Sequence, residues 1–255
     1  MANQQRQDPI REKYYKPVEL AESAGDKLFW VTTGISVALV FIDRKGNERA
    51  YDILQWLLVA TALISFFVGM AARLYALPRA LDARRADLLS QVFEVPLTNE
   101  KTTAYYNNVA PPGMRRLAAT VLENTFFSKE ISREMCNFER IRAAFAAVVF
   151  IGIMRADDLA FPAIAAATVF GEQVFMRWLR LEWFRVRSEQ AYERLYRLLL
   201  NGASDAAFSA EAVDGLTFYE SGKALAASTL SDRIFKKRND ELSARWDELR
   251  ATIGI

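Results

Sequence analysis

The sequence predicts an all-α membrane protein, in which two helical hairpins carry long helices that extend into a cytoplasmic helical domain. Four apolar segments form two pairs, basic residues follow each pair, and no segment of useful length alternates as a β-strand does. A helical hairpin suits lipid because it satisfies its own backbone hydrogen bonds there. The expected divisions are a polar segment 1–25, a first hairpin 26–78, a helical insertion 79–142, a second hairpin 143–176 and C-terminal helices 177–255.

The first hairpin pairs Leu28–Ile42 with Ile53–Leu77 across a polar tip. Only the second of these segments reaches the roughly 20 residues that a spanning helix needs. Its stretch 57–70 is apolar on nearly every face, which indicates either a membrane span or the centre of a large core. Pro78 follows directly, so we expect a kink or break in the helix there.

The insertion is expected to resume as a helix over 79–93, followed by an irregular stretch 95–113 that contains several prolines. Apolar residues at helical spacing predict the next helix over 114–127. Ser128 is then a candidate N-cap for a further helix that runs into the second hairpin.

The second hairpin pairs Ala143–Met154 with Leu159–Phe175. The first of these is shorter than the roughly 17 residues of the shortest spanning helices, so a soluble helical bundle with buried core helices stays open. A long helix over 177–200 should follow, and then two shorter helices. The shorter helices are expected at 210–228 and 232–252, with Ser209 and Ser231 as candidate caps.

Basic residues flank the apolar segments unevenly, and this asymmetry predicts orientation. They gather around the insertion and after the last segment, at Arg73, Arg79, Arg84, Arg85, Arg133, Arg140, Arg142, Arg177, Arg180, Arg185 and Arg187. The two hairpin tips carry fewer. We therefore expect both termini and the insertion to lie in the cytoplasm and both tips to lie outside.

The composition excludes several kinds of chemistry. The chain has 255 residues, 52% of them hydrophobic, a net charge of +2, no histidine and a single cysteine, Cys136. An internal disulfide and a Cys–His nucleophile are thereby excluded, and the commonest metal ligand is missing. The glycines are scattered, so no phosphate-binding loop is present, and acids such as Asp157 and Asp240 fall on expected surfaces. We expect no enzyme activity, no metal and no cofactor.

A set of arginines shares one broad face, about 160° wide, of the helix expected over 177–200. The set is Arg177, Arg180, Arg187, Arg194 and Arg197. The planar fork of arginine binds anionic oxygens, and in a symmetric oligomer such a face would line a cationic shaft that holds an anion. Two alternatives stay open: the helix meets anionic lipid head groups, or acids such as Glu189 and Glu193 neutralise it.

A second candidate site is the stretch 101–108, which contains Tyr105 and Tyr106 and is followed by Arg115 and Arg116. Paired aromatic rings stack on bases, and arginines hold phosphates. The alternative is a tyrosine-rich loop that packs on neighbouring helices.

Glu172 lies in an apolar run of the fourth segment. An ionisable group at membrane depth usually faces a bundle interior or water, so Glu172 is a candidate pore residue. Its place near the cytoplasmic end of the run leaves open that it only reaches the interface.

Three runs of residues carry a resemblance to a known family. They are 84–89 (RRADLL), 105–108 (YYNN) and 123–132 (ENTFFSKEIS). Together with the hairpin layout they resemble bacterial four-segment membrane effectors that act beside nucleotidyltransferases in anti-phage defence, most of all the Hailong type. Lys129, within the third run, is a further candidate ligand-binding residue.

The resemblance implies a homotetrameric ion channel that depolarises the inner membrane and arrests growth. It also implies that a nucleotide or a short single-stranded DNA oligomer, made by the partner nucleotidyltransferase, gates this channel. The Hailong-type ligand holds its channel shut, whereas cyclic nucleotides open related channels, so the sign of the response stays open. The alternative function is a structural or lipid-binding helical membrane protein without channel activity.

Overall fold

The computed structural model describes residues 7–42, 45–103, 105–106, 110–154, 171–201 and 206–255. Within these ranges the chain is helical apart from turns, loops and one isolated antiparallel bridge between Gln7 and Thr103, so the all-α prediction is confirmed for them. The chain forms two compact units. Unit 1 comprises Met1–Lys16, Leu77–Cys136 and Arg180–Ile255, and unit 2 comprises Pro17–Ala76 and Asn137–Leu179.

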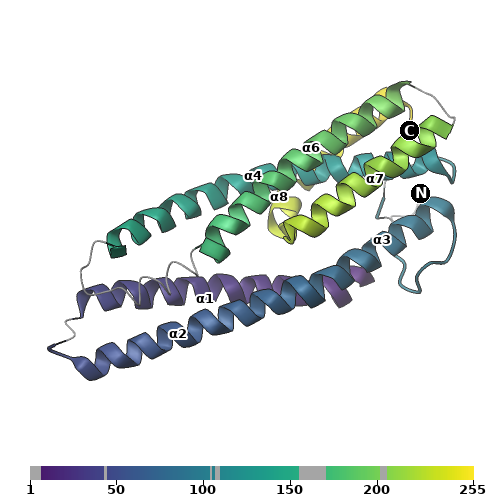
Figure 1. The fold of residues 1–255 in the computed structure, drawn as a ribbon. Coiled ribbons are helices and arrows are strands. Elements are labelled where there is room, and N and C mark those ends of the chain that lie inside the picture. Colours follow the sequence, from purple (N-terminus) through teal and green to yellow (C-terminus); the bar gives the residue numbers. More distant parts are fainter. Residues whose placement is uncertain (1–6, 43–44, 104, 107–109, 155–170, 202–205) are drawn as a thin grey trace. The chain divides into compact units, whose positions relative to one another are not determined.

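Unit 2 contains the segments of the first expected hairpin. Helix α1 (Lys16–Phe41) begins well before the apolar segment that predicts it, after a π-helical turn, η1 (Arg11–Tyr15). Helix α2 (Glu48–Ala71) lies beside α1 (Figure 1). The two helices share a small buried apolar cluster, formed by Leu39, Tyr51 and Leu58.

Two buried hydroxyl groups on α1 are satisfied within their own helix. Thr33 Oγ1 donates a hydrogen bond to the carbonyl of Phe29, and Ser36 Oγ donates one to the carbonyl of Thr32, both at 2.8 Å. Such bonds to a carbonyl four residues earlier remove the need for an external partner. The hydroxyls of Thr33 and Ser36 therefore do not require water around them.

Of the kink or break expected at Pro78, the break is not found, which corrects that part of the sequence interpretation. A π-helical turn, η2 (Ala72–Ala76), joins α2 to helix α3 (Leu77–Phe93) without interruption. Proline lacks an N–H and crowds the carbonyl four residues earlier, and the wider π turn just before it relieves this conflict. The irregularity thus lies before Pro78, and the helix continues through it.

Within the described ranges, one helix is long and apolar enough to cross a membrane by length and composition. It is the continuous helix Glu48–Phe93, and only 11% of its most apolar window is buried inside the structure. The shorter apolar segments Leu28–Ile42 and Ala143–Met154 do not meet this criterion on their own. Residues 155–170 of the second expected hairpin, including Pro162, lie outside the described residues.

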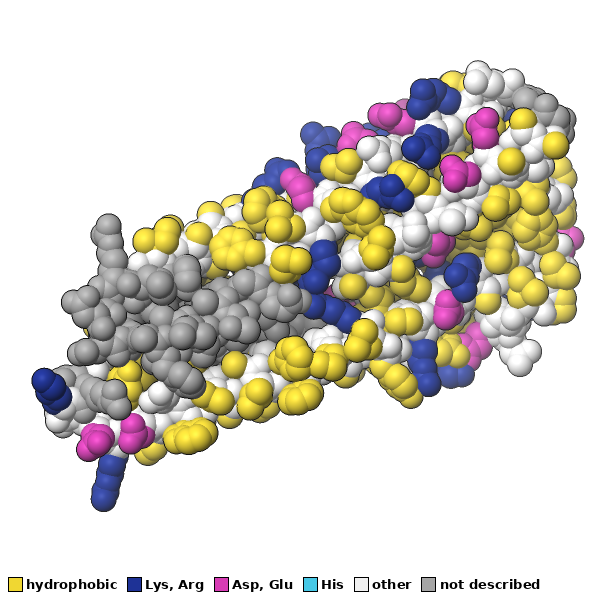
Figure 2. Space-filling model, viewed as in Figure 1, with side chains coloured by type: hydrophobic (Ala, Val, Ile, Leu, Met, Phe, Trp, Pro, Cys, Tyr) yellow, Lys and Arg dark blue, Asp and Glu magenta, His cyan; other side chains and the backbone are white. Residues whose placement is uncertain are grey.

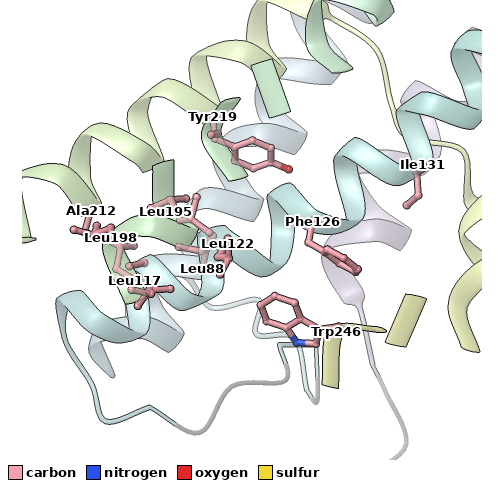
Figure 3. Close-up of a cluster of buried hydrophobic side chains, with 14 of the residues drawn as sticks. Leu88, Leu117, Leu122, Phe126, Ile131, Leu195, Leu198, Ala212, Tyr219 and Trp246 are labelled. Carbon is pink, nitrogen blue, oxygen red and sulfur yellow. The ribbon is translucent and has the colours of Figure 1, made fainter. Parts of the chain in front are cut away.

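Unit 1 has an extensive apolar core. Helix α4 (Met114–Met154) contributes to it with its first half, and helices α6 (Arg177–Asn201), α7 (Ala206–Ala226) and α8 (Asp232–Ile253) pack around it. Figure 3 shows part of this core, in which side chains from distant parts of the sequence meet: Leu88, Leu117, Leu122, Phe126, Leu195, Leu198, Tyr219 and Trp246. The large apolar side chains of unit 1 are thus buried together, as they are in water-soluble domains.

Two of the expected helix caps are wrong, and one is confirmed. α4 runs without a break through Ser128, whose hydroxyl is buried and hydrogen-bonds the hydroxyl of Tyr219 at 2.7 Å. Ser209 likewise lies inside α7. Ser231 is the N-cap of α8, because its side chain accepts a hydrogen bond from the backbone N–H of Ile234.

Large apolar side chains on the surface belong mostly to unit 2. Figure 2 shows hydrophobic side chains gathered along α2. Examples are Phe41 on α1, Trp56 on α2 and Val148 on α4, which are 83%, 74% and 69% exposed. Among its described residues, unit 2 buries small apolar clusters of its own. An exposed apolar surface of this extent indicates a partner surface or a lipid environment.

Candidate functional site

Arg177, the first residue of the predicted arginine face, belongs to an ion cluster inside unit 2. Its guanidinium contacts Asp26 of α1 at 2.9 Å and Glu139 of α4 at 3.2 Å. Arg142 of α4 contacts the same Asp26 oxygen at 2.7 Å, and its guanidinium lies 4.3 Å from the centre of the Phe29 ring. Arg177 is therefore held by neighbouring acids, not presented to a ligand.

The cluster in unit 2 joins two arginines and two acids from three helices. The side chains of Arg142 and Glu139 are only 6% and 4% exposed. Buried charges are tolerated where opposite charges lie beside them, and removing one partner leaves the other uncompensated. Ionisable groups within apolar helical bundles face the interior and pair with one another. The cluster fits that pattern, and sequence spacing gave no sign of it because Asp26 and Arg142 are 116 residues apart.

Two arginines of the predicted face meet at one aromatic ring of unit 1. The guanidinium carbon of Arg187 lies 3.2 Å from the centre of the Phe218 ring, and that of Arg194 lies 4.3 Å from it. Phe218 is on α7, and its role was not foreseen from the sequence. An aromatic face attracts a guanidinium and fixes its plane, so the ring orients both cations.

The other arginines of the predicted face have different surroundings. Arg197 donates from Nε to the carbonyl of Glu193 at 3.3 Å. Arg180 is half-buried on α6. Arg185, outside the predicted set, contacts Glu182 and Glu189 at 3.3 Å each. The predicted single cationic face is thus divided into separate environments, and the Arg187–Arg194 pair is the part that remains as a cationic site.

Lys129 belongs to α4 and packs against a different side of α6. Its ammonium is 3.5 Å from the centre of the Tyr192 ring, and Tyr192 stacks on Tyr196 with an interplanar angle of 12°. Burial lowers the pKa of Lys129. Positions 187 and 192 are about 140° apart around a helix, so Lys129 does not join the Arg187 site.

The predicted tyrosine pair is packed inside unit 1. Tyr105 and Tyr106 meet edge to face at 4.8 Å between ring centres, and the guanidinium of Arg84 lies 4.3 Å from the Tyr105 ring centre. The Tyr106 hydroxyl is buried and has no acceptor among the described residues, and burial raises its pKa well above 10. This geometry matches the alternative of a packed loop. Stacking a base on Tyr106 would require the loop to open.

Arg84 is the centre of this packing. It contacts Asp8 at 2.7 Å, and its guanidinium also lies over the ring of Tyr15. Asp8 and Tyr15 belong to the N-terminal segment, so Arg84 ties that segment to α3. The contribution of Asp8 could not be read from the sequence, since 76 residues separate it from Arg84.

Arg116 supports the loop that precedes α4. Its Nε donates to the carbonyl of Ala110 at 2.6 Å, and its Nη1 contacts the Gln91 carbonyl and Glu94, each at 3.0 Å. These partners occupy the Nε and Nη1 donors of Arg116. Arg115 lies half-buried on the first turn of α4. In the structure, Arg116 therefore stabilises the loop between α3 and α4.

Glu172 falls within the π-helical turn η3 (Gly171–Met176) that leads into α6. Its side chain lies outside the described residues, so its prediction as a pore residue stays a prediction. In the part of the chain that the structure describes, no group of three or more acids or cysteines is placed to hold a metal ion.

A buried polar group of unit 1 offers a test of the packing. Tyr219 shares a hydrogen bond with Ser128, and burial raises the pKa of Tyr219 to about 12. Its unfolded pKa is about 10, so the native state holds this proton more tightly than the unfolded state does. The stability that this contributes is complete below about pH 10 and is lost as the pH rises towards 12.

Between about pH 9.5 and 11.5, the free energy of unfolding should therefore fall by about 2 kcal/mol less in Tyr219→Phe than in the parent chain. At neutral pH the variant should be about 1 kcal/mol less stable, because Ser128 loses its partner. Thermal unfolding followed by far-ultraviolet circular dichroism across this pH range measures both effects. Parallel pH profiles for the two proteins would contradict the assignment.

Comparisons with known proteins give no relative. No family model, curated protein or solved structure matches this chain.

Proposed function

We propose that the chain is a bacterial inner-membrane effector of anti-phage defence. In this proposal it forms a homotetrameric channel whose ligand is a nucleotide or a short single-stranded DNA oligomer from a partner nucleotidyltransferase. Unit 2 is the membrane part, unit 1 is the cytoplasmic sensing part, and the response is membrane depolarisation and growth arrest. The family resemblance of the runs 84–89, 105–108 and 123–132 supports the defence role.

One observation carries the membrane part of the proposal: the two units distribute apolar side chains in opposite ways. Unit 1 buries a large apolar core, whereas the described residues of unit 2 expose large apolar side chains on α1, α2 and α4 and bury few. Apolar surface of this extent is unfavourable in water. In lipid it is favourable, provided that the polar groups are satisfied internally, as Thr33 and Ser36 are.

Substitutions on the exposed apolar face of α2 distinguish a membrane protein from a soluble helical bundle. Ile64 and Phe67 are 51% and 61% exposed. In lipid, an aspartate at the centre of a spanning helix costs about 2.5–3.5 kcal/mol, so Ile64→Asp with Phe67→Asp should markedly reduce membrane insertion. In water the same change would be neutral or would raise solubility.

The measurement is the fraction of chain that resists extraction from membranes at alkaline pH and is released by detergent. Leu225→Asp is the matched control, since Leu225 is 66% exposed but lies on α7 of unit 1. We expect the parent chain and Leu225→Asp to stay with the membrane and the double variant to leave it. A parent chain that remains monodisperse in buffer without detergent would exclude the membrane role.

Channel activity needs a separate test, because a lipid-binding helical protein would also pass the extraction test. We expect the purified chain, reconstituted in liposomes, to collapse a potassium diffusion potential reported by a voltage-sensitive dye. Liposomes that hold the chain and keep the potential, both with and without a short single-stranded DNA oligomer, would favour a structural or lipid-binding protein.

A further inference from the structure

We propose that Arg187 and Arg194, oriented by Phe218, form a clamp for a phosphodiester of a single-stranded oligonucleotide. This inference rests on the proposed function, because it takes a nucleic-acid ligand as its starting point. It assigns the ligand's backbone to one place in unit 1 and separates that place from the tyrosine loop and from Lys129.

The spacing along α6 explains how one ring serves two cations. Positions 187 and 194 are seven residues apart, which corresponds to about 10.5 Å along a helix axis. The Phe218 ring lies over both guanidinium groups, at 3.2 and 4.3 Å from its centre. One ring therefore contacts both cations, although their positions are about two turns apart along the helix.

Two like charges held around one ring repel each other unless an anion lies nearby. Arg187 forms no ion pair with an acid in the described part of the chain, whereas Arg185, two residues earlier, contacts both Glu182 and Glu189. Arg194 has an acid, Asp214, at 3.5 Å, but both side chains are at least half exposed. Exposed pairs of this kind contribute little, so Arg194 is available to a stronger anion.

The stem of Arg187 is packed, and one donor of its charged end lacks an acceptor among the described residues. A Cβ placed on Gly222 would lie 3.5 Å from the Arg187 Cβ, so α7 passes close against the base of this side chain. The Arg187 Nε is buried and finds no acceptor within the described residues. A buried donor without an acceptor is unfavourable, and a small outward movement of the guanidinium onto an anionic oxygen removes this cost.

The chemistry of the pair favours a phosphodiester. Arginine donates two parallel hydrogen bonds to a phosphate, and two arginines together match a group that repeats along a backbone. Aromatic rings beside such cations are a common feature of surfaces that bind single strands without reading their sequence. Phe218 and Trp183, whose ring centre lies 5.4 Å from the Arg187 guanidinium, supply that aromatic character.

The experiment measures binding of a fluorescein-labelled single-stranded DNA oligomer of mixed sequence to the full chain in detergent, over a range of salt concentrations. The variants are Arg187→Gln, Arg194→Gln, Phe218→Leu and the control Arg185→Gln. We expect each of the first two to weaken binding about tenfold or more, and the control to leave it unchanged. Arg187→Gln and Arg194→Gln should each also lower the slope of log affinity against log salt by about 0.7, because one phosphate contact is lost.

Phe218→Leu separates orientation from charge. It should weaken binding while the salt slope stays as in the parent chain, since both cations remain. A purely structural role for Phe218 would lower the melting temperature without this selective loss, so the melting temperature of every variant is measured alongside.

Three results would overturn the clamp. The first is an affinity for the oligomer that Arg187→Gln and Arg194→Gln leave unchanged; this would leave the channel proposal standing. The second is a parent chain that binds no oligomer, in which case liposome conductance still decides whether the chain is a channel. The third is that these two variants lose binding to phosphatidylglycerol vesicles but still bind the oligomer. This result would assign the arginine pair to lipid binding.

Discussion

Trp246→Ala is expected to lower the free energy of unfolding by about 3–5 kcal/mol, one of the two largest effects that the structure predicts. Trp246 is fully buried in the core of unit 1, and its ring centre lies 5.7 Å from that of Phe126. Alanine removes the apolar contact and leaves a cavity between α4 and α8, because the surrounding helices relax only in part. The melting temperature should fall by roughly 6–20 °C.

Circular dichroism in detergent measures this melting temperature, and two further variants control the comparison. Leu225→Ala removes an apolar side chain that is 66% exposed, so it should change stability by less than about 0.5 kcal/mol. Trp246→Phe should recover most of the loss, because the Trp246 indole N–H has no acceptor among the described residues. Equal melting temperatures for Trp246→Ala and Leu225→Ala would contradict the core assignment.

Breaking the pair between Arg84 and Asp8 should have a comparable effect. The two side chains are 10% and 16% exposed, and they join the N-terminal segment to α3. Arg84→Met leaves the Asp8 carboxylate without its partner in a nearly buried position, which typically costs about 3–5 kcal/mol. The loss should appear as a lower melting temperature and as earlier proteolysis of the N-terminal segment.

The neighbouring residue Arg85 provides the matched control. Its side chain is 52% exposed and contacts Asp82, so Arg85→Met should cost no more than about 1 kcal/mol. Replacing both partners, by Asp8→Ala together with Arg84→Met, should recover part of the loss because no charge is then left unpaired. If Arg84→Met and Arg85→Met were equally destabilising, the Arg84–Asp8 contact would not hold the segment.

The sequence predicted those features that depend on neighbours within a few residues. Apolar stretches and helical spacing placed helices at positions close to α2, α3, α6 and α8, and Ser231 was identified as a cap. Ser128 and Ser209 show the limit of this reasoning. A serine caps a helix only if the chain begins there, and at Ser128 packing against Tyr219 keeps α4 continuous.

The candidate sites depended more on the fold. The arginine spacing correctly placed Arg187 and Arg194 on one side of α6, since helix geometry fixes that relation. It could not show that Arg177 pairs with Asp26 and Glu139, or that the other two contact the Phe218 ring. The aromatic pair Tyr105 and Tyr106 reads equally as a stacking surface or as a packed loop until the surrounding helices are known.

The sequence by itself determined that this chain is helical, that its apolar residues are concentrated in segments, and where its arginines repeat. Only the tertiary structure decided which charges are already paired, which apolar faces stay bare, and which cations share a ring. The reason is physical. Helix periodicity arises from contacts three or four residues apart, whereas burial and pairing join residues such as Asp8 with Arg84 and Asp26 with Arg142 across 76 and 116 positions of the chain.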